Sequence, residues 1–135
     1  MRLSRMNLVV GCVLAVTLGC FLVPSTTLGF DIEIDVAPNV LNIQSESTVV
    51  TVHTDIAYSL VVGASVYLND VEIYYSKSDN RGYFVAKFLA DEIKTLDGLI
   101  IDDYNTLTLN GYTTGGEAFI GTQDIMVIDI LPSGK

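Results

Sequence analysis

The side chains that could carry out catalysis are few, and their spacing does not bring them together. His53 is the only histidine; with Thr51 and Asp55 it alternates with other residues along a predicted strand, so we expect all three side chains to face solvent. A catalytic zinc ion needs three protein ligands, and Ser-His-Asp chemistry lacks a G-x-S-x-G nucleophile motif here. The sequence therefore predicts no catalytic residues and a protein that is not an enzyme.

Two adjacent acids, Asp102 and Asp103, are the candidates for binding a cation. On a strand they would point to opposite faces, whereas in a loop both carboxylates could reach one ion. The segment Ser76–Gly82 faintly resembles a calcium loop, but its one carboxylate, Asp79, is accompanied by two cations. We predict a hairpin turn there, and neither a metal nor another cofactor.

Tyrosine side chains offer a different chemistry, because aromatic faces stack on sugar rings. Of the seven tyrosines, Tyr74, Tyr75, Tyr83 and Tyr112 are the candidates for a ligand-binding cluster. Tyrosine is also a favoured strand residue that pairs across strands, so a structural role is the alternative. Exposed tyrosines gathered on one sheet face would favour carbohydrate binding, and scattered, buried rings would argue against it.

An acidic strand is predicted at the start of the domain, where acidic and aliphatic residues alternate. It comprises Asp31, Ile32, Glu33, Ile34, Asp35 and Val36. A period of two indicates a strand with one buried face. An N-terminal strand of this kind can pair with a neighbouring molecule, and its acidic face would make such self-assembly depend on salt.

Further strands are predicted where short apolar runs lie between turn signals. Their ranges are 40–43, 48–54, 65–68, 71–75, 83–88, 106–109, 118–121 and 124–131. Asn69-Asp70 and 78–82 predict turns, and the spacing of apolar residues in 89–96 predicts one or two helical turns that cross between sheets. The pattern predicts an all-β fold, an immunoglobulin-like β-sandwich of about seven to nine short strands.

The first 29 residues have the layout of a secretory signal peptide: Arg2 and Arg5, an apolar run over 8–23, and a small residue, Gly29. Retention as a membrane anchor, or lipid attachment at Cys20, are the alternatives. We predict that 1–29 is a signal peptide and that 30–135 is a single β-sandwich domain, secreted, periplasmic or on the cell surface. Both cysteines precede 30–135, which therefore holds no disulfide.

The charge of 30–135 restricts its partners. This segment carries five Lys or Arg and all 16 Asp and Glu, a net charge of −11. Such a domain repels nucleic acid. We expect other proteins, a second copy of the chain or glycans as partners, and a membrane only if the N-terminal segment is retained or lipidated.

The order of several short motifs resembles a family of secreted bacterial and archaeal immunoglobulin-like β-sandwich modules. The matching pieces are the opening at Val36–Ser45, V-x-V at Val50–Val52, V-x-L-N at Val66–Asn69, the K-F strand at Ala86–Phe88, and a loosely matched end at Leu107–Ile128. Many members carry an aspartate-rich, calcium-like loop before the K-F strand, which is degenerate here because only Asp79 is acidic. The resemblance implies accessory or surface modules without catalytic residues.

These observations favour a non-catalytic secreted module with a cell-surface, matrix or interaction role, with self-assembly through the edge strand as a variant. The alternative is a carbohydrate-binding module that uses exposed tyrosines. A more remote alternative is an enzyme, which would need His53, or Asp102 and Asp103, in a concave pocket with other polar groups.

Overall fold

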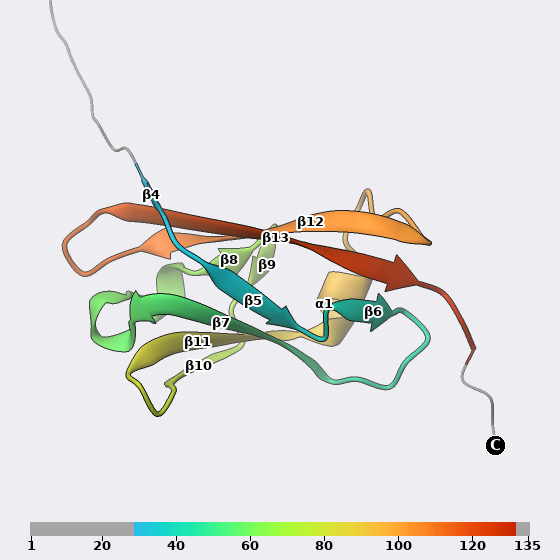
Figure 1. The fold of residues 1–135 in the computed structure, drawn as a ribbon, viewed down its shortest axis with the longest axis horizontal. Helices are drawn as coiled ribbons and strands as arrows, with labels where there is room; N and C mark the ends of the chain where they lie inside the picture. Colours follow the sequence, from blue (N-terminus) through green and yellow to red (C-terminus); the bar gives the residue numbers. More distant parts are fainter. Residues whose placement is uncertain (1–28, 132–135) are drawn as a thin grey trace, which may run out of the picture.

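The computed structural model describes residues 29–131, in which two β-sheets pack face to face (Figure 1). The predicted signal peptide, with Cys20, lies outside the described residues. Among the residues that are described, no helix is both long and apolar enough to cross a membrane. The predicted all-β sandwich with one short helix is confirmed.

The first sheet has four strands in the order β10-β11-β7-β5. They are β5 (Ile34–Ala37), β7 (Val49–Ala57), β10 (Tyr75–Ser78) and β11 (Tyr83–Leu89). All neighbours in this sheet are antiparallel.

The second sheet has six strands, and β13 lies between β12 on one side and the short parallel strands β4 and β6 on the other. The strands are β4 (Phe30–Asp31), β6 (Val40–Asn42), β8 (Tyr67–Leu68), β9 (Val71–Glu72), β12 (Asp103–Tyr112) and β13 (Ala118–Ile128). Two 3-10 turns, η1 (Tyr58–Leu60) and η2 (Gly63–Ser65), connect β7 to β8.

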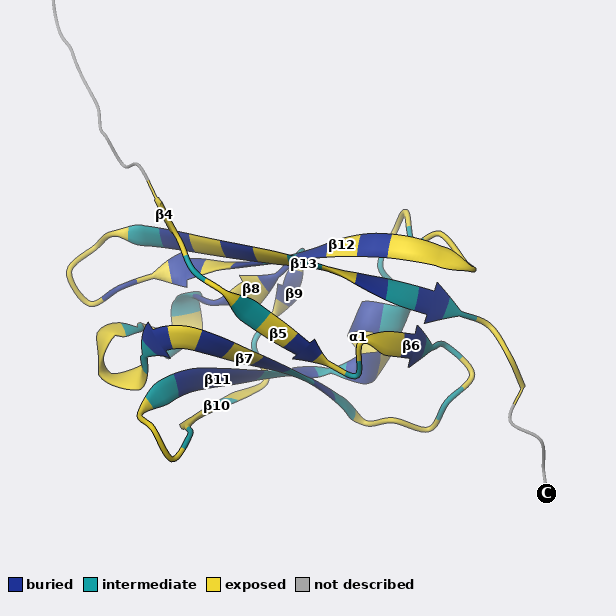
Figure 2. Cartoon of the chain, viewed as in Figure 1, coloured by how far each residue is buried: buried dark blue, intermediate teal, exposed yellow. Residues whose placement is uncertain are grey.

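The core lies between the two sheets. Along each long strand, every second side chain points inward and is buried there (Figure 2). The largest fully buried side chains include Phe84, Phe88, Phe119, Leu41, Leu68, Leu107 and Leu109. Burying one such side chain stabilises the fold by roughly 1.5–3 kcal/mol. Because the described part of the chain contains no cysteine, packing of this kind takes the place of disulfides.

The one short helix, α1 (Ala90–Lys94), carries the chain from β11 to β12 and thus from one sheet to the other, as predicted. Ala90 and Ile93 are fully buried against the core. Asp91 and Glu92 lie in the first turn, where their negative charges interact favourably with the helix dipole.

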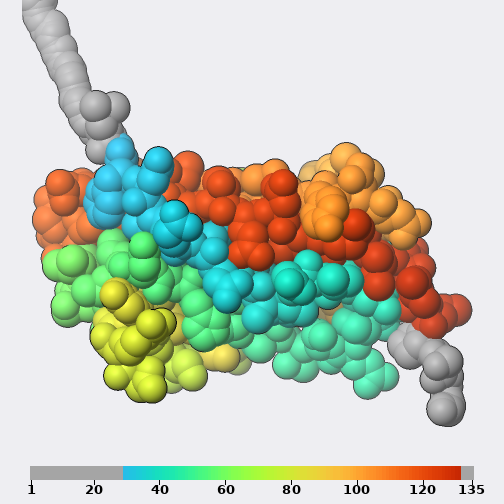
Figure 3. All heavy atoms as spheres, in the orientation of Figure 1, coloured from blue at the N-terminus to red at the C-terminus, as the bar shows by residue number. Residues whose placement is uncertain are grey.

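The predicted single strand over Asp31–Val36 is wrong. The Ile32 amide donates to the Ile120 carbonyl of β13 at 2.8 Å, whereas the Glu33 carbonyl accepts from the Asp55 amide of β7 at 3.3 Å. The segment therefore crosses between sheets at this point, and Figure 3 shows it lying over the seam between β13 and β7. Alternation could not reveal the crossing, because the aliphatic side chains point into the same core from either sheet.

The two long strands also differ from prediction. Strands expected at 118–121 and 124–131 form one continuous β13, and the strand expected at 106–109 extends over the whole of β12. Gly121 looks like a break in the sequence, but it lies within β13 because the crossing segment passes close to it. An added Cβ would lie 2.7 Å from Ile34 Cγ2 and 3.0 Å from the Ile32 carbonyl oxygen.

Candidate functional site

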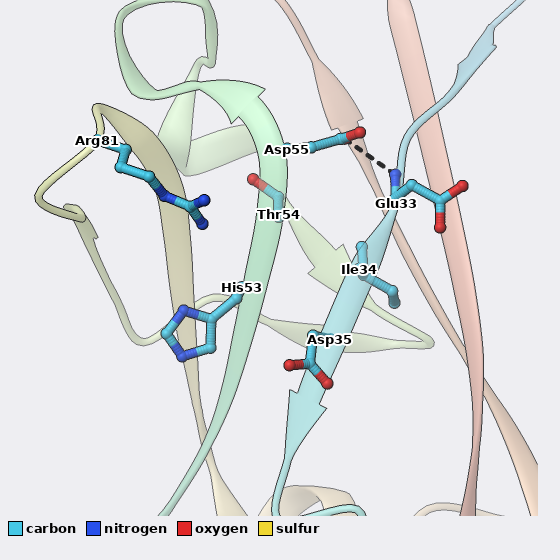
Figure 4. Close-up of a pocket in the computed structure, with 7 residues that line it drawn as sticks. All are labelled: Glu33, Ile34, Asp35, His53, Thr54, Asp55 and Arg81. Atoms are coloured by element: carbon cyan, nitrogen blue, oxygen red, sulfur yellow. Dashed lines mark hydrogen bonds between the residues drawn. The ribbon is translucent and has the colours of Figure 1, made fainter.

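The outer face of the four-stranded sheet contains a shallow hollow around His53 (Figure 4). It is lined by Glu33, Ile34, Asp35, His53, Thr54, Asp55 and Arg81. His53 is exposed, as predicted. Asp35 is its cross-strand partner on β5, yet the imidazole extends toward β11, away from that carboxylate (Figure 4).

The hollow offers little for nucleophilic catalysis. Its one hydroxyl belongs to Thr54, which is buried, and Thr54 Oγ1 donates to the Phe84 carbonyl at 2.6 Å. On the opposite side, Asp55 Oδ1 accepts from the Glu33 amide at 2.9 Å and so holds β5 against β7. Among the residues that line the hollow, the Thr54 hydroxyl and the Asp55 carboxylate are thus engaged in holding the sheet together.

The candidate cation ligands lie where the loop after α1 meets β12: Asp102 is the last residue of the loop, and Asp103 is the first residue of β12. The Asp102 amide donates to the Val127 carbonyl at 2.7 Å, and Asp103 Oδ1 accepts from the Tyr104 amide at 2.7 Å. Asp102 has a positive φ of 63°, which places it in a tight turn. Within residues 29–131, no three His, Cys, Asp or Glu side chains are grouped closely enough to hold a metal ion.

Asp79 closes the turn between β10 and β11. Its Oδ1 accepts from the Tyr83 amide at 2.9 Å and from the Arg81 amide at 2.8 Å. The Tyr83 hydrogen bond is the largest cause that holds the pKa of Asp79 below its ordinary value, and the Arg81 amide and guanidinium add to the effect. The carboxylate therefore stabilises a hairpin, the structure predicted for this segment.

The four tyrosines proposed from the sequence do not form a cluster. Tyr74 and Tyr75 lie at the start of β10 and Tyr83 at the start of β11, on the four-stranded sheet, whereas Tyr112 ends β12 on the other sheet. Tyr83 is half-buried, with the Arg81 guanidinium carbon 5.3 Å from its ring centroid. A single ligand site made from all four is thus excluded.

A different group of tyrosines does share one face. Tyr104 and Tyr112 point outward from β12, and Tyr67 points outward from β8 directly opposite Asn110. Their exposed fractions are 62%, 54% and 40%. We call the outward side of β8, β12 and β13 the tyrosine face. Its uncharged polar members are Thr106, Thr108, Asn110 and Thr122, and it also carries the exposed acids Asp124, opposite Thr106, and Glu72, opposite Tyr67.

Sequence reasoning missed Tyr67 and Tyr104, although a signal for Tyr104 was present. Residues 106–111 alternate between polar and apolar or small types, and Tyr104 and Tyr112 fall on the polar side when one strand is assumed over 104–112. Tyr67 carries no such signal, because its neighbourhood depends on the pairing of β8 with β12.

Comparison with known proteins gives no match: no protein-family model, no curated protein and no solved structure matches the chain. The immunoglobulin-like family resemblance of the sequence therefore stays a prediction.

Proposed function

We propose that this chain is a secreted, non-catalytic β-sandwich module that binds an extended extracellular partner through its tyrosine face. One observation carries the proposal: three exposed tyrosines and a row of hydroxyl and amide side chains share one open sheet face. Exposed aromatic groups with polar neighbours are characteristic of interaction surfaces. This arrangement and the signal-peptide layout of 1–29 support a cell-surface or matrix role.

The spacing on the face suits a long ligand. Tyr104 and Tyr112 are eight residues apart on one strand, which corresponds to about 27 Å. Tyr67 lies on the strand next to Tyr112, diagonal to it and about 7–8 Å away. A small ligand would meet one end of the face, whereas a polymer laid along β12 would meet both.

Neutral polysaccharide is the ligand class that this chemistry favours. Tyrosine rings can stack on pyranose rings, while Thr106, Thr108, Asn110 and Thr122 offer hydroxyl and amide groups to sugar hydroxyls. The net charge of −11 for 30–135 disfavours anionic polymers. The alternative ligand for the tyrosine face is another protein.

The self-assembly variant has less structural support. The Asp31–Val36 segment already pairs within the chain, through β4 on β13 and β5 on β7. β5 is an edge strand, and the Val36 amide of β5 donates to the side chain of Gln123 on β13, at 2.8 Å from its Oε1. Fewer backbone groups of this segment are thus available to a neighbouring molecule.

The polysaccharide proposal is tested by co-sedimentation with cellulose and chitin and by affinity electrophoresis in soluble xylan and glucomannan. We expect the double variant Tyr67→Ala/Tyr112→Ala to bind at least about tenfold more weakly, a loss of about 1.4 kcal/mol. The matched control is Tyr74→Ala/Tyr75→Ala, which removes two rings from the other sheet that are at least as exposed, 62% and 54% against 40% for Tyr67 and 54% for Tyr112.

Two results would contradict the proposal. If the wild-type protein binds none of these polysaccharides, that ligand class is wrong. If both double variants lose binding equally, the ligand lies elsewhere than on the tyrosine face.

A further inference from the structure

The outer face of the four-stranded sheet is divided into an acidic half and a basic half. The acidic half comprises Asp35 on β5, Glu33 just before β5, and Asp55 on β7. The basic half comprises Lys77 on β10 and Lys87 on β11. We call this surface the divided face. It is separate from the tyrosine face, which belongs to the other sheet.

The distribution of cations makes this division unusual for so acidic a chain. Residues 29–131 contain four Lys or Arg, and three of them, Lys77, Arg81 and Lys87, are at the divided face. The fourth, Lys94, lies on α1 and donates to the Ser45 carbonyl at 2.7 Å. The basic groups are thus concentrated on one side of one sheet.

The pairing registers arrange the divided face in rows. The central row reads Asp35–His53–Val85–Lys77 across the four strands, with an acid at one end and a base at the other. Val85 is only 1% exposed although it lies outside the core cluster, so neighbouring side chains of the face cover it. His53 is its cross-strand partner, and the His53 ring extends toward β11 (Figure 4).

A second copy of the chain complements this row. A two-fold axis parallel to the strands, lying between β7 and β11 in the plane of contact, keeps each row in place and exchanges its two ends. Asp35 then faces Lys77 of the second copy, and Lys77 faces its Asp35. An in-plane axis perpendicular to the strands would instead place Asp35 over Asp35, so the charge pattern selects the first arrangement.

One of the two neighbouring rows agrees with the same axis; the other, which begins with Glu33 and Asp55, is interrupted by the register shift between Tyr83 and Val85. The row that agrees reads Ala37–Thr51–Lys87–Tyr75, so Ala37 would lie under the Tyr75 ring of the second copy. Thr51 would meet Lys87 of the second copy, and Lys87 Nζ already contacts the Thr51 hydroxyl of its own chain at 3.3 Å. Neither contact brings like charges together.

We propose that two copies of this chain associate face to face through the divided face, with the Asp35–Lys77 pair formed twice. Four strands about 4.8 Å apart and five residues about 3.4 Å apart give a contact of about 20 Å by about 17 Å. This is well below the roughly 800 Å² per partner of a stable interface, so the dimer is weak and reversible.

Sedimentation velocity of the purified protein, over a range of concentrations and NaCl, tests the proposal. Raising NaCl from 0.01 M to 0.1 M shortens the screening length from about 30 Å to about 10 Å, and we expect the dimer Kd to rise about five- to tenfold. Edge-to-edge pairing of acidic strands predicts the opposite sign, because salt would relieve its repulsion. A protein that is monomeric throughout, or that dimerises more in salt, overturns the proposal.

Charge reversal tests the pairing itself. Asp35→Lys and Lys77→Glu should each abolish the dimer, and an equimolar mixture of the two should restore it as a heterodimer, because Lys at 35 then faces Glu at 77 and Asp35 faces Lys77. Glu46→Lys and Lys94→Glu make the same charge changes away from the face and should leave dimerisation unchanged. Circular dichroism melting confirms that each variant is folded.

Two outcomes of the charge-reversal experiment would overturn the two-fold arrangement. One is a folded single variant that still dimerises like the wild type. The other is a mixture of the two variants that remains monomeric.

Discussion

Replacing Asn105 with alanine tests how the end of the tyrosine face is held in place. The Asn105 side chain is 8% exposed and ties the turn before β12 to the strand. Its Oδ1 accepts from the Ile100 amide at 2.8 Å, and its Nδ2 donates to the Ile100 carbonyl at 2.9 Å and to the Asp103 carbonyl at 3.1 Å. Tyr104, at one end of the face, is positioned by this turn.

The magnitude follows from these three hydrogen bonds. Each contributes about 1 kcal/mol net, and a backbone group left unsatisfied costs about 1–3 kcal/mol. Ile100 is largely exposed, so water can replace part of what is lost. We expect Asn105→Ala to lower the free energy of unfolding by about 2–3 kcal/mol. With a urea m-value of about 1.5 kcal/mol/M, the midpoint should fall by about 1.5 M.

Urea unfolding followed by circular dichroism provides the assay, and hydrogen exchange of the Ile100 amide gives a local readout. Thr106→Ala is the control, because it lies next to Asn105 but loses one exposed hydrogen bond, from Thr106 Oγ1 to Asp124 Oδ1 at 2.6 Å. We expect it to cost no more than about 1 kcal/mol. If Asn105→Ala is no more destabilising than Thr106→Ala, or if the Ile100 amide exchanges equally in both, the reasoning is refuted.

Three other substitutions test the crossing segment and the β10–β11 turn. Gly121→Ala should destabilise the fold and expose the N-terminal segment to proteolysis, because its Cβ would lie 2.7 Å from a side-chain carbon of β5; Gly115→Ala, with 3.7 Å to its nearest neighbour, should not. Gln123→Ala should speed hydrogen exchange of the Val36 amide, and Gln123→Glu, which keeps the acceptor, should restore protection; equal exchange in both variants would contradict the role of this bond. Asp79→Asn should be less stable than the wild type at pH 6. Because folding lowers the pKa of Asp79, its stabilisation is fully present above the ordinary carboxyl pKa and is lost as pH falls through the lowered value, so a difference that persists unchanged in strong acid would contradict this account.

Local patterns predicted the elements whose form depends on neighbours in the sequence. Asn69 adopts a positive φ of 53° at the turn between β8 and β9, where Asn-Asp indicated a tight turn. The helical spacing at 89–96 became α1, and the alternation around His53 placed that side chain in solvent. In each case steric limits on the backbone or a fixed side-chain period acts within a few residues.

The candidate sites could not be predicted in the same way, because they depend on which strands become neighbours. The sequence grouped Tyr74, Tyr75, Tyr83 and Tyr112, but the pairing of β8 with β12 groups Tyr67 with Tyr112. Tyr74 and Tyr75 are adjacent in the sequence, yet they lie on the opposite sheet from Tyr112.

What the amino-acid sequence by itself determined was the all-β class, the acidic character and the turns, since composition and side-chain period are local properties. Only the tertiary structure decided that Asp31–Val36 divides between two sheets. The same holds for the row that joins Asp35 to Lys77, two residues 42 positions apart in the chain. The physical reason is that a strand presents the same alternation to any partner, and long-range packing of the core chooses which partner it meets.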